Sequence, residues 1–109
     1  MAEKDNLIRL NILKFYNLIK NIYPVKKILI YGSHAKGLAH KDSDIDVAVI
    51  VDVKEHKKRI EITSTLFHYA NLIDCNIEPK CIFWDEYHDY DKASILAEII
   101  RTGKEITLH

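Results

Sequence analysis

Two aspartates separated by a single residue carry the clearest chemical signal in the chain. Asp44 and Asp46 stand directly before an apolar run, residues 47–51. Alternate side chains of an extended strand leave the same face, so the two carboxylates point in one direction. At the mouth of a dry core they repel each other and are costly to desolvate. Mg²⁺ removes this conflict, since it takes one or two carboxylates and fills its remaining positions with water and substrate phosphates.

A glycine and a serine, Gly32 and Ser33, follow the preceding apolar run and predict a phosphate cradle. Backbone N–H groups at the start of a helical turn hold phosphate, and glycine allows close approach. The Ser33 hydroxyl either contacts the phosphate or caps the turn. Gly37 then frees the backbone to fold back toward the aspartates. Lys36 and Lys41 either neutralise phosphate charge or are solvated loop lysines.

Apolar residues at helical spacing predict three helices to position these groups, over residues 4–22, 54–73 and 93–102. The first should stop before Pro24, because proline pushes the preceding residue out of helical dihedrals. Gly103 is well placed as the C′ residue of the third. The expected buried positions are Ile8, Ile12, Phe15, Ile19 and Ile22 in the first helix, Ile62, Leu66, Tyr69 and Ile73 in the second, and Ile95, Leu96, Ile99 and Ile100 in the third.

Three strands are expected, over residues 27–31, 44–51 and 75–84. The middle strand is apolar on both faces and should be central. Pro79 cannot donate a ladder hydrogen bond, so the third strand should lie at an edge or be locally bulged there. Its two predicted faces are Cys75, Ile77, Cys81 and Phe83 on one side, and Asn76, Glu78 and Lys80 on the other. The order of elements predicts a small α/β (α+β) fold, with a short mixed sheet of three to five strands flanked by helices.

Length and charge restrict the class of protein. The 109 residues fit one domain, expected to cover residues 1–109. The 16 basic and 16 acidic residues give a formal net charge of zero, which argues against binding nucleic acid by bulk electrostatics. Cys75 and Cys81 do not form a CxxC pair, so two reduced thiols are expected rather than a zinc site. The charged N-terminus and the absence of a long apolar run predict a soluble, cytoplasmic protein with no membrane partner.

The motif of residues 32–37 (GSHAKG) followed by residues 43–47 (SDIDV) resembles the nucleotidyltransferase superfamily of DNA polymerase β, poly(A) polymerases and kanamycin nucleotidyltransferase. The short chain narrows this resemblance to the minimal nucleotidyltransferases. Residues 99–105 are similar to the usual end of that group. The chain departs from the pattern at His34, where many relatives have arginine. Triphosphate binding at His34 is therefore expected to be weaker or pH-dependent.

The resemblance implies a nucleotidyltransferase-like fold and a two-metal transfer. Asp44 and Asp46 would hold two Mg²⁺ ions on the nucleotide triphosphate. A third carboxylate from a later strand would help to ligate the metal nearer the acceptor and assist removal of the hydroxyl proton. Glu78 is the best choice because it lies on the polar face of its strand. Asp74, an even number of residues earlier, falls on the same face and is the second choice. Asp85 and Glu86 are instead expected in the loop that follows. The residues expected to bind the nucleotide are Gly32, Ser33, Lys36, Gly37 and Ser43.

The resemblance also implies a partner. Transfer of AMP from ATP is the simplest activity, and the chain has no residues left for an acceptor domain. Minimal nucleotidyltransferases are typically paired with a HEPN-family toxin, which some of them adenylylate. The alternative is a non-catalytic, nucleotide-binding antitoxin or subunit that neutralises its partner by contact. An aminoglycoside acceptor is disfavoured by the missing acceptor domain. The nucleotide base, the acceptor and self-association into a homo-oligomer stay open.

Overall fold

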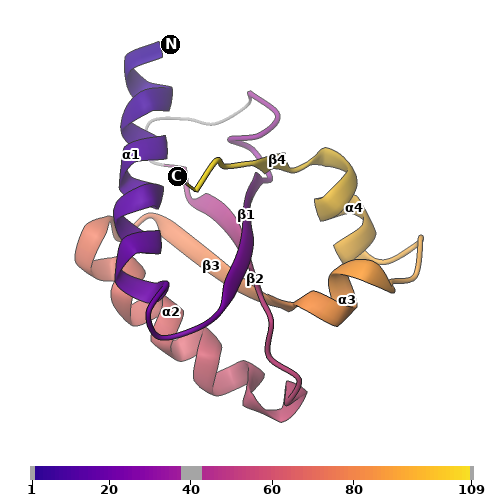
Figure 1. Ribbon diagram of the computed structural model, residues 1–109. Coiled ribbons are helices and arrows are strands. Elements are labelled where there is room, and N and C mark those ends of the chain that lie inside the picture. Colours follow the sequence, from indigo (N-terminus) through magenta and orange to yellow (C-terminus); the bar gives the residue numbers. More distant parts are fainter. Residues whose placement is uncertain (1, 38–42, 109) are drawn as a thin grey trace.

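A computed structural model describes residues 2–37 and 43–108 (Figure 1). Within these ranges the elements follow one another as a helix, a hairpin, a helical crossover and a C-terminal group of short elements. Their bounds are α1 (Ala2–Ile19), β1 (Val25–Tyr31), β2 (Ile45–Val51), the 3₁₀ turn η1 (His56–Lys58), α2 (Arg59–Ile73), β3 (Ile77–Phe83), α3 (Trp84–His88), α4 (Ile95–Thr102) and β4 (Lys104–Glu105).

The strands form one mixed sheet in the order β3-β2-β1-β4. β1 is antiparallel to β2 and to β4, whereas β2 and β3 are parallel. Parallel neighbours need a crossover connection, which α2 supplies. The prediction of a small α+β fold with a short mixed sheet is confirmed, and β2 is central as its apolar run predicts.

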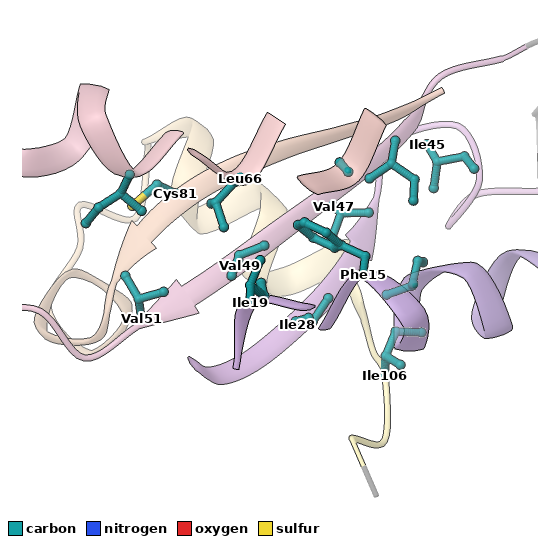
Figure 2. Close-up of a cluster of buried hydrophobic side chains, with 14 of the residues drawn as sticks. Phe15, Ile19, Ile28, Ile45, Val47, Val49, Val51, Leu66, Cys81 and Ile106 are labelled. Atoms are coloured by element: carbon teal, nitrogen blue, oxygen red, sulfur yellow. The ribbon is translucent and has the colours of Figure 1, made fainter. Parts of the chain in front are cut away.

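Helices cover both faces of the sheet. α1 and α2 pack on one face, where their side chains meet alternate residues of β2 in the main core (Figure 2). α3 and α4 lie on the other face, over a smaller cluster. The first face is lined by Ile45, Val47, Val49 and Val51 of β2, and the second by Ala48 and Ile50. Because side chains alternate along a strand, Asp46 belongs to the face of α3 and α4.

The helix ends differ from the sequence prediction in ways that local hydrogen bonds explain. α1 ends at Ile19, and the chain turns there because the Ile22 and Tyr23 N–H groups both donate to the Ile19 carbonyl. Ile22 is therefore exposed, not buried as predicted. α4 begins at Ile95, since the Ser94 hydroxyl caps it by accepting from the Ala97 N–H. Ile95 is consequently 74% exposed and outside the apolar stripe.

Gly103 follows α4 as predicted, but not in a left-handed conformation. Its φ is −71°, so the expected C′ geometry is wrong. A Cβ at Gly103 would instead crowd the Ile99 carbonyl, because the Gly103 N–H donates to that oxygen at 2.7 Å. Glycine is needed here for close backbone approach.

The region around β3 carries the remaining corrections. Cys75 precedes the strand and is exposed, whereas Cys81 is buried; both thiols are free. Asp85 and Glu86 lie in the short helix α3 rather than in a loop. β4 had no signal in the sequence pattern. Among the described residues, no helix is long and apolar enough to cross a membrane.

The edge position predicted from Pro79 is confirmed, since β3 ends the sheet. Side chains block much of its open edge. Arg59 Nη1 donates to the Cys81 carbonyl at 2.8 Å, and Glu86 Oε1 accepts from the Phe83 N–H at 3.0 Å. An edge without free ladder groups cannot template pairing with another chain.

Candidate active site

A row of polar side chains crosses one end of the sheet. Asp46 of β2 is in register with Tyr31 of β1 on one side and with Glu78 of β3 on the other. All three are half-buried, and Asp44, just before β2, is exposed. The structure therefore brings the two predicted aspartates and the preferred third carboxylate to one place on the face of α3 and α4.

The carboxylates of this row raise one another's pKa. The pKa of Asp46 is raised by burial and then by the charge of Asp44, while His34 opposes the shift. The pKa of Glu78 is raised by hydrogen-bonding contact with Asp44, by burial, and by the charges of both aspartates. Burial and the neighbouring carboxylates thus both disfavour the ionised forms of Asp46 and Glu78.

This donor set fits a divalent cation. Its oxygens are hard ligands, and their raised pKa values show the repulsion that a cation would remove. Across the described side chains, no three His, Cys, Asp or Glu groups converge tightly enough to cage a metal by themselves. Mg²⁺ does not require such a cage, because it binds through one or two carboxylates and takes waters and substrate phosphates as its other ligands.

Tyr31 is a member of the row that the sequence reasoning missed. Burial, followed by the charges of Asp46 and Glu78, raises its pKa to about 12. The sequence could have indicated the position of Tyr31. If residues 27–31 and 44–51 pair as antiparallel neighbours, the residue before Gly32 can lie opposite Asp46.

The predicted phosphate cradle is a hydrogen-bonded turn directly after β1. The Lys36 N–H donates to the Gly32 carbonyl at 3.2 Å, and Gly32 and Gly37 have φ values of +73° and +72°. A Cβ at Gly32 would also overlap Asp46 Oδ2. Gly32 therefore has two local reasons to be glycine, a left-handed backbone and the proximity of Asp46.

The other predicted nucleotide contacts lie around this turn. Ser33 and Ser43 are half-buried, and Lys36 is exposed. His34 Nε2 lies 3.4 Å from the Ser43 carbonyl oxygen, which links the turn to the entrance of β2. Lys41 lies outside the described residues.

The alternative third carboxylate, Asp74, is engaged elsewhere. It ends α2, and its Oδ1 accepts the Asn76 N–H at 2.9 Å. Its carbonyl also accepts from the Ile77 N–H at 3.0 Å, so Asp74 shapes the turn into β3. The geometry favours Glu78 over Asp74, while the role of Glu78 stays a prediction.

A cavity of about 280 Å³ opens beside the row. Tyr31, Asp46 and Glu78 line it on the sheet side. From α2 it is lined by Arg59, Thr63 and Phe67. The carboxylates are thus accessible from the open edge of the sheet.

Comparison with known protein families assigns the chain to one of them. Residues 13–108 match the family model described as polymerase beta, nucleotidyltransferase. The chain belongs to this family. It is accordingly a nucleotidyltransferase. Of the acidic row, which comprises Asp44, Asp46 and Glu78, the two aspartates belong to the sequence motif.

Individual relatives agree with this assignment. A Methanocaldococcus jannaschii protein, named as a candidate protein adenylyltransferase, is 32% identical over 72 residues, which cover 64% of this chain and 72% of that protein. A crystal structure of a toxin–antitoxin with AMP-PNP matches with a TM-score of 0.57 at 23% identity. A mutant of the toxin–antitoxin MntA–HpeT, with two aspartates changed to glutamate, matches with a TM-score of 0.51 at 20% identity. Both structural matches cover 91% of this chain and 72% of the other, and they establish the shared fold.

Proposed function

We propose that this nucleotidyltransferase transfers AMP from ATP to a hydroxyl group of a partner protein, with two Mg²⁺ ions. The observation that carries the proposal is the register of Asp46 with Glu78 beside the exposed Asp44. This row lies at the end of β1 where the Gly32 turn begins. The residues that we propose as metal ligands, acceptor-side carboxylate and phosphate cradle thus lie at one end of the sheet.

Each acidic residue has a role in this proposal. Asp44 and Asp46 would hold Mg²⁺ on the triphosphate, where the metal neutralises charge developing at the phosphates. The acceptor oxygen forms a bond to the α-phosphorus, and the bond from that phosphorus to the bridging β-phosphate oxygen breaks. Pyrophosphate leaves, while the acceptor proton passes to the Glu78 carboxylate and then to water. The raised pKa of Glu78 suits a proton acceptor.

The turn after β1 would bind the nucleotide. Backbone N–H groups at Gly32 and Ser33 are suited to a phosphate, and Gly37 closes the turn. The side chains of Ser33, Lys36 and Ser43 are the further contacts that we assign to the nucleotide.

The acceptor would be supplied by another protein. The relative named as a candidate protein adenylyltransferase and the toxin–antitoxin structures support this assignment, one of those structures holding AMP-PNP. We assign the partner to the HEPN family and place the pair in the cytoplasm. The 280 Å³ cavity beside Glu78 offers the acceptor hydroxyl a route to the carboxylates from the edge of β3.

The test uses ATP labelled at its α-phosphate, Mg²⁺ and the protein co-expressed with its neighbouring reading frame. The parent protein should label the partner. Glu78→Gln should lower transfer by at least about 100-fold, the usual contribution of a positioned proton acceptor. Its binding of Mg²⁺–ATP should stay close to normal. Asp74→Asn is the matched control, because its amide oxygen can still accept the Asn76 N–H.

Two outcomes would contradict the proposal. If the parent silences its partner without labelling it, the protein is an antitoxin that acts by contact. If Asp74→Asn abolishes transfer while Glu78→Gln does not, the assignment of the third carboxylate is wrong.

A further inference from the structure

The Tyr31 hydroxyl is a nucleophilic group beside the acidic row to which the proposed transfer gives no role. Tyr31 ends β1 and pairs directly with Asp46, whose other neighbour in register is Glu78. Side chains of directly opposed residues leave the same face of an antiparallel pair, with their Cβ atoms about 4.5–5.5 Å apart. The Tyr31 side chain therefore lies next to a carboxylate that we propose as a metal ligand.

Tyr31 also faces the route proposed for the acceptor. It is half-buried, and it lines the 280 Å³ cavity together with Asp46 and Glu78. Across residues 2–37 and 43–108, no hydrogen bond engages the Tyr31 hydroxyl, whereas the Tyr87 hydroxyl accepts from Lys27 Nζ at 3.4 Å. The cavity through which a partner's hydroxyl would enter is thus already lined by a hydroxyl-bearing side chain of this chain.

We propose that Tyr31 is a second acceptor, adenylylated by the active site of its own chain when no partner protein occupies the cavity. This inference rests on the proposed function, because it uses the same transfer of AMP from ATP. The Tyr31 oxygen forms a bond to the α-phosphorus, and the bond from that phosphorus to the bridging β-phosphate oxygen breaks. Pyrophosphate leaves, and the phenol proton passes through a water in the cavity to the Glu78 carboxylate and then to solvent.

The position of Tyr31 favours this reaction and gives it a consequence. A hydroxyl fixed beside the proposed phosphate site reacts within one molecule, which removes the entropic cost of bringing two molecules together. AMP joined to Tyr31 stays in the cavity and blocks the route of a partner's hydroxyl to Glu78. Self-modification therefore switches off transfer in a chain that has ATP but no partner.

The experiment incubates the purified protein alone with Mg²⁺ and ATP labelled at its α-phosphate, and then locates the labelled peptide by mass spectrometry. The parent should carry the label on Tyr31, and Tyr31→Phe should carry none. Glu78→Gln should lower self-labelling by at least about 100-fold, because it removes the proposed proton acceptor. Tyr69→Phe is the matched control and should be labelled like the parent, since Tyr69 is also half-buried but packs on the main core and does not line the cavity.

Dilution tests whether the reaction stays within one chain. The fraction of the parent that is labelled after a given time should not change when the protein is diluted at constant ATP. A fraction that falls in proportion to the protein concentration would indicate attack between chains, and it would overturn the assignment to the chain's own active site.

The outcomes separate this inference from the proposed function. If the parent labels its co-expressed partner but not itself, the inference is overturned and the function stands. Label on a residue other than Tyr31, found in the peptides of the parent, would also overturn it, whatever the behaviour of the variants. If the parent labels neither itself nor the partner, the proposed function fails.

Discussion

The two ends of β3 carry charged clusters of opposite character. At its start, Glu78 meets Asp44 and Asp46, and the pKa values of Glu78 and Asp46 are raised. Beyond its end, His56 Nε2 lies 2.9 Å from Asp85 Oδ1, and Arg59 pairs with Glu86. Desolvation works against ionised Asp85, but the hydrogen bond and charge of His56 lower its pKa overall.

We interpret the paired cluster as structural and propose that the acidic cluster is functional. The paired cluster joins elements: Arg59 of α2 contacts the Cys81 carbonyl, and Glu86 of α3 accepts from the Phe83 N–H. His56 stacks on the Phe83 ring with 4.2 Å between centroids. In the acidic cluster, burial and neighbouring carboxylates instead disfavour the ionised forms of Asp46 and Glu78. We propose that a bound cation supplies the compensating charge there.

The largest expected effect lies at the acidic end. Asp46→Asn keeps the shape of the side chain and removes one charge from a proposed metal ligand. Transfer should fall by at least about 100-fold, as when one preorganised electrostatic group is removed from a transition state. The metal-free melting temperature should stay level or rise, because carboxylate repulsion is relieved. If Asp46→Asn transfers AMP as fast as the parent, the acidic cluster is not the functional one and the contrast with the paired cluster fails.

The paired end should show the reverse pattern. Glu86→Ala leaves Arg59 and the Phe83 N–H without the partner that the structure gives them. Losing such a partner should lower the free energy of unfolding by about 1–3 kcal/mol, measured by urea denaturation. Mg²⁺–ATP binding should be unaffected. Weakened nucleotide binding with unchanged stability would mean that Glu86 belongs to the site instead.

A smaller effect concerns the sign of the pH dependence. The folded pKa values of Asp46 and Glu78 lie above the ordinary values of these side chains, 3.8 and 4.5. Their contribution to stability is therefore complete below the unfolded pKa values and is lost as pH rises through the folded ones. The folded pKa of Asp85 lies below 3.8, so its contribution is present above that value and lost as pH falls through the folded pKa.

Melting curves in EDTA between about pH 3 and pH 7 would measure these opposite signs. Asp46→Asn and Glu78→Gln should reduce the loss of stability that accompanies a rise in pH. Asp85→Asn should reduce only the loss of stability that accompanies a fall in pH. This effect should be small, because the ion pair of Asp85 with His56 is exposed and surface pairs contribute little. The same sign for all three variants would contradict the contrast between the clusters.

Strand patterns predicted the acidic row well. A run that is apolar on both faces must be central, and its alternation fixes the face of Asp46. Pro79 fixes β3 at an edge, since only there is its missing N–H harmless. The alternation of side chains then leaves Glu78 and Asp74 as candidates. The register of Glu78 with Asp46 and the turn hydrogen bonds of Asp74 distinguish them.

The paired end of β3 and the contact of α1 with the C-terminal segment were not predictable in this way. α3 has no apolar repeat; Glu86 accepts from the Phe83 N–H at its start and pairs with Arg59 of α2 across the fold. Arg9 and Lys104 are 95 positions apart in sequence. They line one cavity only because β4, a strand of two residues, pairs with β1 beside α1. Contacts of this kind leave no periodic signal.

Thermal unfolding with ATP, in Mg²⁺ and in EDTA, tests the central claim that the acidic row is a metal-dependent nucleotide site. A ligand that binds only the folded state raises the melting temperature by mass action. The account predicts a clear rise for the parent with Mg²⁺ and ATP together, a much smaller rise with ATP and EDTA, and little difference between the two conditions in Asp46→Asn. Equal rises for the parent with and without Mg²⁺ would contradict it.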